Sequence, residues 1–163
     1  SEVGYDLLIA IPPHEAPKVV RPASGGTKLT NQVGWIPVDP LTLKVTGVPG
    51  SGEVYAVGDI TSVPLPGRYK PDVELSLPKA GVFAEAHGWV AAHQIAAKIL
   101  GRETSETFDG RGFCYLEVGG GRAVKADGSF FELPHPVMQK QTPDEVQFRD
   151  KVAWVARHLN PVS

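Results

Sequence analysis

Residues 53–59 read EVYAVGD and residues 78–101 read PKAGVFAEAHGWVAAHQIAAKILG, and these two runs decide the class of fold. The first is rich in β-forming apolar residues up to a Gly-Asp pair, which predicts a central strand that ends in a polar turn. The second has few polar members and is bounded by Pro and Gly, which predicts a buried helix over Lys79–Leu100. Gly88, inside that helix, predicts close packing of another backbone. A strand followed by a long helix indicates a mixed α and β fold.

The strand end and the helix start together carry the first functional signal. A strand delivers its last side chain, here the Asp59 carboxylate, to the edge at which open α/β sheets bind ligands. The helix that starts near Lys79 supplies unpaired N–H groups and the positive end of a helix dipole. A ligand with hydroxyl groups and an electron-rich end suits this pair. The spacing leaves a second interpretation open, in which Asp59 caps a turn.

Shorter elements surround these two runs, and alternation, turn residues and caps predict them. Residues Tyr5–Ile11 are mostly apolar and precede two prolines, which predicts a buried strand. The last third of the chain predicts an antiparallel meander with glycine turns, then a helix that begins with a capping box of Thr142 and Glu145. The other predicted segments are an edge strand at Gly34–Asp39, a long functional or mobile loop at 61–78, meander strands at 113–118, 122–126 and 129–133, and a helix at 143–159.

The composition is that of a globular chain. It has 163 residues, about one domain's worth, of which 42% are hydrophobic and 21% charged. Sixteen basic residues against eighteen acidic ones give a net charge of −2, which argues against a general nucleic-acid binder. The 18 glycines and 15 prolines predict many turns and few long elements. No apolar run approaches the ~20 residues of a membrane-spanning helix.

Several chemical motifs are absent from the sequence. It contains neither GxGxxG nor GxxxxGK[ST], and it has no GxSxG elbow. The single cysteine, Cys114, excludes an internal disulfide and a multi-cysteine metal site. The five histidines have no metal-ligand spacing, and His87 and His93 fall on different faces of the predicted helix. The sequence therefore predicts no metal site.

A resemblance becomes specific when the segments GWIPVDPLTLKV, EVYAVGDIT and LPKAGVFAEAHGWVAAHQIAAKILG are taken together. They resemble the second flavin motif of the pyridine nucleotide-disulfide oxidoreductases, which have two dinucleotide-binding domains. Within these, they are most similar to the branch of sulfide:quinone oxidoreductases, flavocytochrome c sulfide dehydrogenases and type II NADH dehydrogenases. The resemblance implies FAD as cofactor, with the Gly58-Asp59 pair at its ribityl chain and a hydrogen bond from that chain to Asp59. It also implies that the helix start at Pro78, Lys79 and Ala80 points at the pyrimidine edge of the flavin, where the helix dipole favours reduction.

The same resemblance implies a domain organisation. The opening YDLLIAIPPHEAP looks like the last strand and exit of an inserted NAD(P)-type domain, which would end with a linker at residue 27. Residues 28–105 would then be the C-terminal half of an FAD-binding domain, and residues 106–163 a β-meander and helix. The expected fold class is α/β (α+β), with half of a Rossmann-like domain plus a small C-terminal antiparallel sheet and helix. Because the family's GxGxxG is missing, we expect a fragment of a larger flavoprotein that by itself binds FAD weakly or not at all.

Cys114 is the residue that the resemblance makes informative about the subfamily. The segment FDGRGFCYLEVGGG resembles a strand of the sulfide-oxidising members, in which a cysteine pairs with one from the inserted region over the flavin. Cys114 is thus a candidate catalytic redox thiol, with the thiolate as its competent form. Its partner would lie outside this sequence. The alternative is a small buried apolar residue with a structural role.

The candidate residues for the electron-acceptor site lie in the last third of the chain. Phe130 and Phe131 resemble the segment near the quinone pocket, where a phenyl ring would stack on a quinone, and the alternative is an aromatic hairpin packed in the core. The closing helix carries Trp154 among basic residues, which suits packing onto the domain or a weak peripheral association with a membrane. The resemblance places the whole protein in the cytoplasm, on the cytoplasmic membrane, or in the periplasm as a flavocytochrome-type subunit.

The sequence thus predicts an FAD-dependent oxidoreductase that passes electrons from sulfide or NAD(P)H to a quinone or a haem subunit, most like a sulfide:quinone oxidoreductase. A type II NADH dehydrogenase with a structural Cys114 is one alternative, and a non-catalytic binding domain that reuses the half fold is another. The expected partners are the missing N-terminal part of the same protein and the electron acceptor, with no nucleic acid. A half-domain also exposes core surface, so pairing between two fragments is expected.

Overall fold

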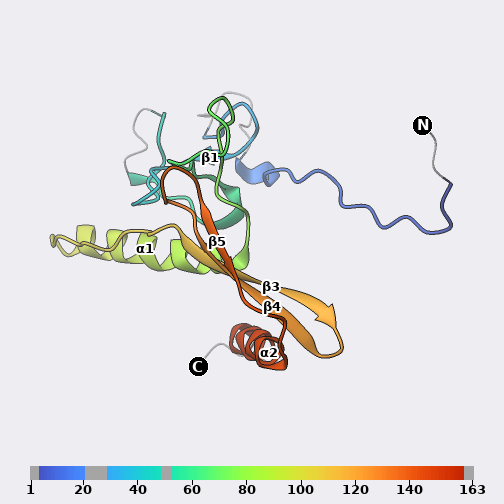
Figure 1. Cartoon of the computed structure of the whole chain (residues 1–163). Coiled ribbons are helices and arrows are strands. Elements are labelled where there is room, and N and C mark those ends of the chain that lie inside the picture. Colours follow the sequence, from blue (N-terminus) through green and yellow to red (C-terminus); the bar gives the residue numbers. More distant parts are fainter. Residues whose placement is uncertain (1–3, 21–28, 49–52, 160–163) are drawn as a thin grey trace.

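The computed structural model describes residues 4–20, 29–48 and 53–159, and it is mixed α and β. Irregular segments with a small parallel sheet lie against one long helix, α1, while an antiparallel sheet and a second helix, α2, follow it (Figure 1). The elements of the described residues are η1 (Lys18–Val20), β1 (Ile36–Pro37), η3 (Gly58–Ile60), β2 (Thr61–Ser62), α1 (Gly81–Ile99), β3 (Arg111–Gly119), β4 (Arg122–Ser129), β5 (Val137–Lys140) and α2 (Glu145–Leu159).

Each strand of the parallel sheet is only two residues long. β1 pairs with β2 in parallel, with Ile36 opposite Thr61. The predicted edge strand at Gly34–Asp39 is therefore confirmed in its central two residues. The predicted central strand at 53–59 is wrong, because only Tyr55 forms an isolated bridge, to Lys44, before η3 begins. A central strand needs a hydrogen-bonded neighbour on each side. The described residues provide a neighbour on one side only.

The core lies between these irregular segments and α1. Leu43 is fully buried there with a φ of 62°, a left-handed conformation unusual for a non-glycine residue. Aromatic rings complete the core, since the Phe83 ring on α1 meets the Phe108 ring edge to face at 6.2 Å between centroids. The fully or nearly buried members of the cluster are Ile36, Val38, Leu43, Val45, Ala56, Val63, Phe83, Val90 and Phe108.

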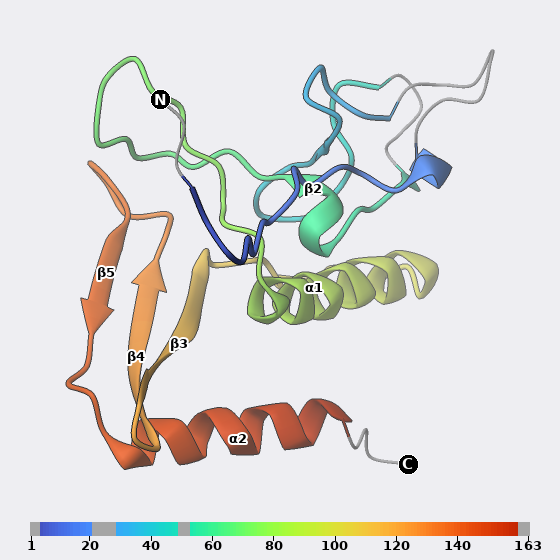
Figure 2. The ribbon, with the colours of Figure 1, turned by 90° about the vertical axis from the view of Figure 1, so that its right-hand side faces the viewer.

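Helix α1 is confirmed to within two residues of its predicted bounds, but it is not a buried helix. Its buried residues are Phe83, His87, Val90 and Ala91, all on the side of the core. Trp89 is 62% exposed. Figure 2 shows the reason: the irregular segments cover one side of α1, and α2 approaches the other side near the start of α1. The predicted close packing at Gly88 is also wrong, because a Cβ there would meet no atom of the described segments within 4 Å.

The antiparallel sheet has the order β3-β4-β5. The first two strands confirm the predicted meander, with Cys114 opposite Ala126. The predicted third strand at 129–133 is wrong, since β5 lies eight residues later. The cause is the aromatic pair in between: Phe130 packs edge to face on Phe83 at 5.3 Å, and Phe131 packs on Phe108 at 5.5 Å. These contacts turn the chain into the core before it returns as β5.

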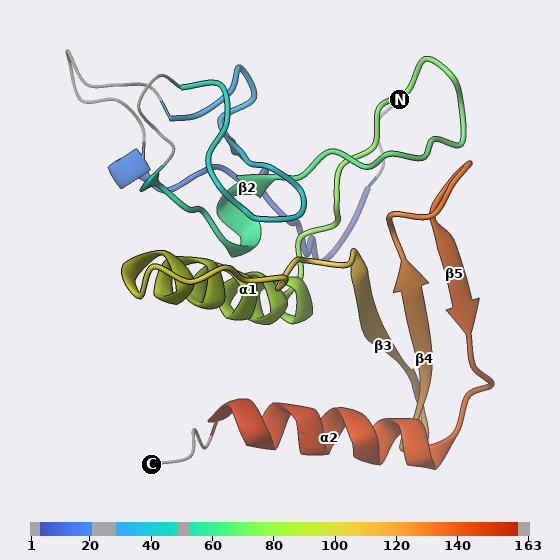
Figure 3. The same ribbon diagram turned by 90° about the vertical axis from the view of Figure 1, so that its left-hand side faces the viewer.

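Helix α2 begins at the lower end of the sheet and runs from there beneath α1 in Figures 2 and 3. The predicted helix is confirmed, but its predicted cap at Thr142 is wrong. The Asp144 side chain accepts the Val146 N–H at 2.6 Å and so caps the first turn. No residue of α2 is buried, and the Trp154 ring meets Phe113 of β3 at 6.4 Å between centroids. Helix α2 therefore packs against the rest of the chain through one face only.

The predicted buried strand at Tyr5–Ile11 is wrong. These residues form no strand and run away from the rest of the chain (Figure 1). Their large apolar side chains are 60–86% exposed. Apolar character alone favours a strand, but a strand forms only beside another one, and none of the described segments takes that place. Within the described ranges, no helix combines the length and the apolar character needed to cross a membrane.

Candidate functional site

The residues predicted to bind the cofactor lie around two cavities that flank the start of α1. The first cavity, of about 490 Å³, is lined by Asp59 and Lys79 together with Trp35 and with Pro13–Glu15 of the N-terminal segment. The second, of about 220 Å³, is lined by Ala80 and the next two residues. Lys79 and Ala80 are adjacent in the chain, so a single peptide joins the linings of the two cavities. The structure therefore brings the predicted cofactor residues together.

Gly58 holds the turn before Asp59 tightly against α1. Its φ is +70°, and a Cβ built on it would lie 3.1 Å from the Cβ of Ala84. Both the left-handed backbone and the close approach favour glycine here. The Gly58 N–H also donates to Nδ1 of His87 at 3.1 Å. Two turns of α1 thus position the turn that carries the Asp59 carboxylate.

Lys79 ties the same turn to the chain just before α1. Its ammonium donates to the backbone carbonyl of Asp59 and, at 3.0 Å, to that of Thr61. The Nζ atom also lies 3.7 Å from the centroid of the Trp35 ring, a cation–π contact. Burial lowers the pKa of Lys79, and the Asp59 charge opposes this shift. Because its ammonium bonds to two backbone carbonyls of the protein, Lys79 acts as a positioning residue.

Asp59 lines the first cavity and is exposed. Its carboxylate accepts no hydrogen bond from the described residues, and η3 has no side-chain cap. Thr61 Oγ1 instead satisfies the turn by donating to the Gly58 carbonyl at 2.8 Å. The interpretation of Asp59 as a turn cap therefore finds no support in the geometry. The carboxylate is free to accept hydrogen bonds from a ligand.

The start of α1 presents open N–H groups to the second cavity. Ala80 is the N-cap and has no side chain that could satisfy them, and the first turn contains no acidic residue. The Phe83 and Ala84 N–H groups already bond to the Ala80 carbonyl. The N–H groups of Gly81 and Val82 precede the first of these bonds, where a helix leaves its donors unpaired. This end carries the positive pole of the helix dipole, so it favours an electron-rich ligand atom.

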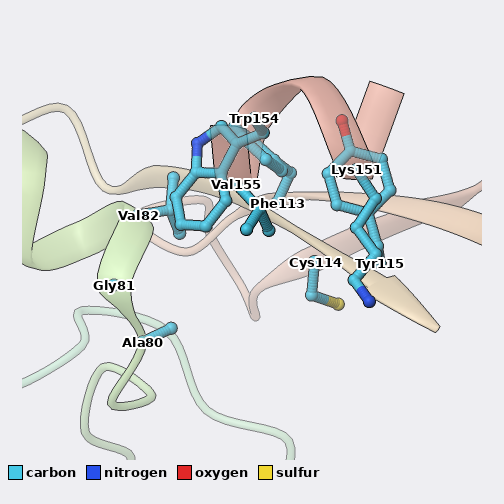
Figure 4. A pocket seen from close by; sticks show the side chains of 9 residues that line it. All are labelled: Ala80, Gly81, Val82, Phe113, Cys114, Tyr115, Lys151, Trp154 and Val155. Atoms are coloured by element: carbon cyan, nitrogen blue, oxygen red, sulfur yellow. The ribbon is translucent and has the colours of Figure 1, made fainter. Parts of the chain in front are cut away.

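Cys114 lies at the second cavity, together with the start of α1 (Figure 4). Its thiol is free and exposed on β3. The alternative of a buried structural cysteine is therefore not what the structure has. Three elements form the cavity wall: Ala80, Gly81 and Val82 come from the start of α1, Phe113, Cys114 and Tyr115 from β3, and Lys151, Trp154 and Val155 from α2.

Phe130 and Phe131 lie apart from Cys114 and its cavity. Phe130 packs against the core through Phe83. Phe131 also packs on the core and lines a third, apolar cavity of about 390 Å³. The remaining lining residues of that cavity are Pro40, Leu41, Pro64, Leu65 and Pro66. The structure thus does not bring these two phenylalanines to the cofactor residues.

Sequence reasoning missed three residues that shape the site. The Trp35 ring makes a cation–π contact with the Lys79 ammonium, and His87 accepts a hydrogen bond from the Gly58 N–H. Trp154 lines the cavity that also contains Cys114. The helical spacing could have indicated His87, since it shares a face with Phe83. The sequence indicates Trp35 only as part of the motif GWIPVDPLTLKV, and Trp154 only for packing onto the domain or a membrane, because tertiary packing alone brings them to the start of α1. No group of three or more potential metal ligands exists in the described ranges.

No protein-family model matches the chain. The assignment of a function therefore depends on the geometry of these cavities and on the resemblance of the three motif segments.

Proposed function

We propose that this chain forms part of the flavin site of an FAD-dependent oxidoreductase, of the branch that contains the sulfide:quinone oxidoreductases. One observation carries the proposal. Lys79 bonds to the carbonyls of Asp59 and Thr61, so that a free carboxylate and the open end of α1 flank a single peptide. The resemblance implies these two groups, in this order, for the ribityl chain and the pyrimidine edge of a flavin.

The residues present suit the parts of FAD in turn. The Asp59 carboxylate accepts hydrogen bonds from hydroxyl groups such as those of a ribityl chain. The N–H groups of Gly81 and Val82 donate to a carbonyl oxygen, and the dipole of α1 favours negative charge at that end. Phe113 and Trp154 offer apolar surface beside it. When bound, the flavin supplies the redox chemistry that transfers electrons from donor to acceptor.

The proposed fold unit at 28–105 is the C-terminal half of an FAD-binding domain, between a linker and the unit at 106–163. In this proposal a segment that carries GxGxxG completes the site by holding the pyrophosphate. The shortness of β1 and β2 and the half-exposed Val54 and Val57 support it, because apolar side chains of a parallel sheet are normally covered. The chain by itself is then expected to bind FAD weakly.

Cys114 is proposed as one half of a redox pair whose other cysteine lies outside this sequence. Its exposure on β3 and its place beside the start of α1 support that role over a purely structural one. The electron donor is then sulfide, and a quinone or a haem subunit accepts the electrons. With NAD(P)H as donor, the protein is a type II dehydrogenase, in which Cys114 is dispensable.

The decisive experiment uses the whole protein that carries this chain, under anaerobic conditions. Sulfide and NADH are added in separate cuvettes while the yellow absorbance band of the flavin is followed. Bleaching by sulfide that is lost in Cys114→Ser supports the sulfide oxidoreductase. Bleaching by NADH alone, unchanged in Cys114→Ser, supports the type II dehydrogenase.

A second measurement separates both enzymes from a non-catalytic binding domain. Asp59→Asn keeps the size of the side chain and leaves the Lys79 bonds to the backbone in place. We expect it to weaken FAD binding about tenfold, because a charged acceptor is lost. Glu103→Gln, an exposed change outside the flavin cavities, is the matched control. Purification of the whole protein without any bound flavin, and failure to take up added FAD, would reject the proposed function.

A further inference from the structure

One side of α1 is apolar, free of charge and open to solvent. Residues 86–97 contain no Asp, Glu, Lys or Arg, although a surface helix normally carries charged residues on its outer side. The side of α1 that faces away from the core instead presents apolar side chains at helical spacing. We call this side the α1 patch, and its members are Trp89 (62% exposed), Ala92, Ile95 (40%), Ala96, Ile99 (78%) and the C-cap Leu100 (61%).

Helix α2 leaves the α1 patch uncovered. It packs against the first turns of α1, where a Cβ on Gly81 would lie 3.6 Å from the Trp154 ring and the Glu85 carboxylate lies 3.2 Å from Nε2 of His158. His158 is the next-to-last residue of α2, whereas α1 continues to Ile99. Figure 3 shows the second half of α1 extending past the last described turn of α2. The patch therefore begins where α2 ends, and it is open to another molecule.

Trp89, the largest side chain of the α1 patch, is held in a fixed orientation. Its ring meets the ring of His93, one turn later in α1, with 4.4 Å between the centroids. Nδ1 of His93 donates to the Trp89 carbonyl at 2.9 Å and so holds the imidazole in place. Tryptophan is among the residues that contribute most to binding energy at protein interfaces, and an ordered side chain loses little conformational entropy on binding. Trp89 is therefore suited to anchor a second surface.

We propose that two copies of the chain form a dimer in which their α1 patches face each other and the two α1 helices pack antiparallel across a two-fold axis. With the axis near residue 93, helical spacing places Trp89 of one copy opposite Ala96 of the other, so that a large side chain meets a small one. The two-fold axis makes the same contact twice. A patch without charged residues suits a copy of itself, because none of its side chains calls for an opposite charge. The inference is independent of the proposed flavin chemistry.

The area of the α1 patch is enough for a dimer of moderate affinity. Trp89 exposes about 150 Å² of apolar surface, and the rest of the patch exposes about 400 Å². The two copies together then bury about 1,100 Å², above the roughly 1,000 Å² that a biological interface needs. Because this area lies near the lower end of the range, the dimer should dissociate on dilution.

The test measures the molar mass of the chain by light scattering during gel filtration. At high concentration we expect twice the 17.4 kDa of one chain, and a single-chain mass for the double variant Trp89→Asp/Ile99→Asp. Leu7→Asp/Ile9→Asp is the matched control, because it places two aspartates at exposed apolar positions outside the patch, and it should remain a dimer. Trp89 and Ile99 are exposed in the single chain, so their double variant should keep its circular dichroism spectrum.

Ala96→Lys tests the same surface with a smaller risk to the fold. It keeps a good helix former at an exposed position and places a charge opposite Trp89 of the other copy, so it should weaken the dimer at least tenfold. Tryptophan fluorescence of the wild type should shift to longer wavelength on dilution, and this shift should be absent in Trp89→Phe. A wild-type chain that stays monomeric at high concentration overturns the proposal, whether or not it binds lipid vesicles. A dimer that survives Trp89→Asp/Ile99→Asp, or one that is lost in the control, overturns it equally.

Discussion

The backbone N–H of Gly58 donates to Nδ1 of His87, 29 residues later, with 3.1 Å between the two nitrogens. This ring nitrogen is therefore an acceptor, and His87 is neutral with its proton on Nε2. Nε2 is buried and has no hydrogen-bond acceptor among the described residues, and the imidazole meets the Phe108 ring edge to face at 4.6 Å. A neutral histidine thus joins the turn before Asp59 to the core side of α1.

Protonation of His87 should destabilise the fold in mild acid. Burial lowers the pKa of His87 from 6.5 to about 4, so the native state binds this proton less tightly than the unfolded chain does. The contribution of neutral His87 is complete above about pH 6.5 and is lost as the pH falls toward 4. Its full loss amounts to about 3 kcal/mol in the free energy of unfolding. Urea unfolding between pH 4 and 7 measures it.

The matched variants of that experiment are His87→Gln and His93→Gln. Glutamine at 87 keeps an acceptor for the Gly58 N–H but does not titrate, so the pH dependence should flatten. His93 lies on another face of α1, where it is partly exposed. His93→Gln should leave the slope unchanged, and an equal change of slope in both variants would refute the assignment to His87.

Two glycines should respond in opposite directions to alanine. A Cβ at Gly112 of β3 would overlap the Phe83 ring, so Gly112→Ala should lower stability by about 2 kcal/mol. A Cβ at Gly88 of α1 would meet nothing within 4 Å. Gly88→Ala should therefore raise stability by about 1 kcal/mol, because alanine favours a helix interior. Denaturant midpoints of both variants check this, and a stabilising Gly112→Ala would contradict the packing of β3 on α1.

Lys79 should matter to the cavity at Asp59 more than to the fold as a whole. Lys79→Met removes two charge-assisted hydrogen bonds to the carbonyls of Asp59 and Thr61. The free energy of unfolding should fall by about 2 kcal/mol. If the proposed function holds, FAD binding by the whole protein should also weaken at least tenfold. Lys98→Met on α1 is the control, because it loses only a surface ion pair with Glu53. Similar flavin affinities of the two variants would count against a positioning role for Lys79.

The long loop that follows β2 should depend on one tyrosine for its position. Tyr69 donates to the Pro136 carbonyl at 2.8 Å and stacks on the His135 ring at 5.0 Å between centroids. Tyr69→Phe keeps the stacking and loses the hydrogen bond, so stability should fall by about 1 kcal/mol. Tyr5→Phe, in the exposed N-terminal segment, should change nothing. Equal melting temperatures for wild type and Tyr69→Phe would show that the bond is not formed in solution.

The ion pair between α1 and α2 should appear in the titration of His158. Its bond to the Trp154 carbonyl raises the pKa of His158 above 6.5, and the Glu85 carboxylate, 3.2 Å from Nε2, raises it further. Glu85→Gln should therefore lower the pKa of His158 without removing the contribution of Trp154. Proton NMR of the imidazole across pH 5–8 measures it. An unchanged titration in Glu85→Gln would mean that α2 does not rest on α1 in solution.

Sequence alone determined the elements whose signals are local. The run from Lys79 to Leu100 is bounded by Pro78 and Gly101, and it forms a helix within two residues of its predicted ends. The β3–β4 hairpin follows from alternating strands around three glycines. Propensity, punctuation and caps act over a few residues, so such elements can be read directly from the chain.

Tertiary structure decided everything that depends on neighbours. Tyr5–Ile11 and Glu53–Asp59 read as strands, yet neither forms one, because a strand exists only where another chain segment bonds beside it. The third strand forms later in the chain than predicted, because Phe130 and Phe131 pack against the core.

The site shows the same division between sequence and structure. The sequence placed a carboxylate at Asp59 and a helix start near Lys79. Packing alone brought Trp35 under the Lys79 ammonium and placed Cys114 in the cavity beside Ala80. Contacts between residues distant in the chain depend on the free energy of the whole packed arrangement, and no local pattern records them.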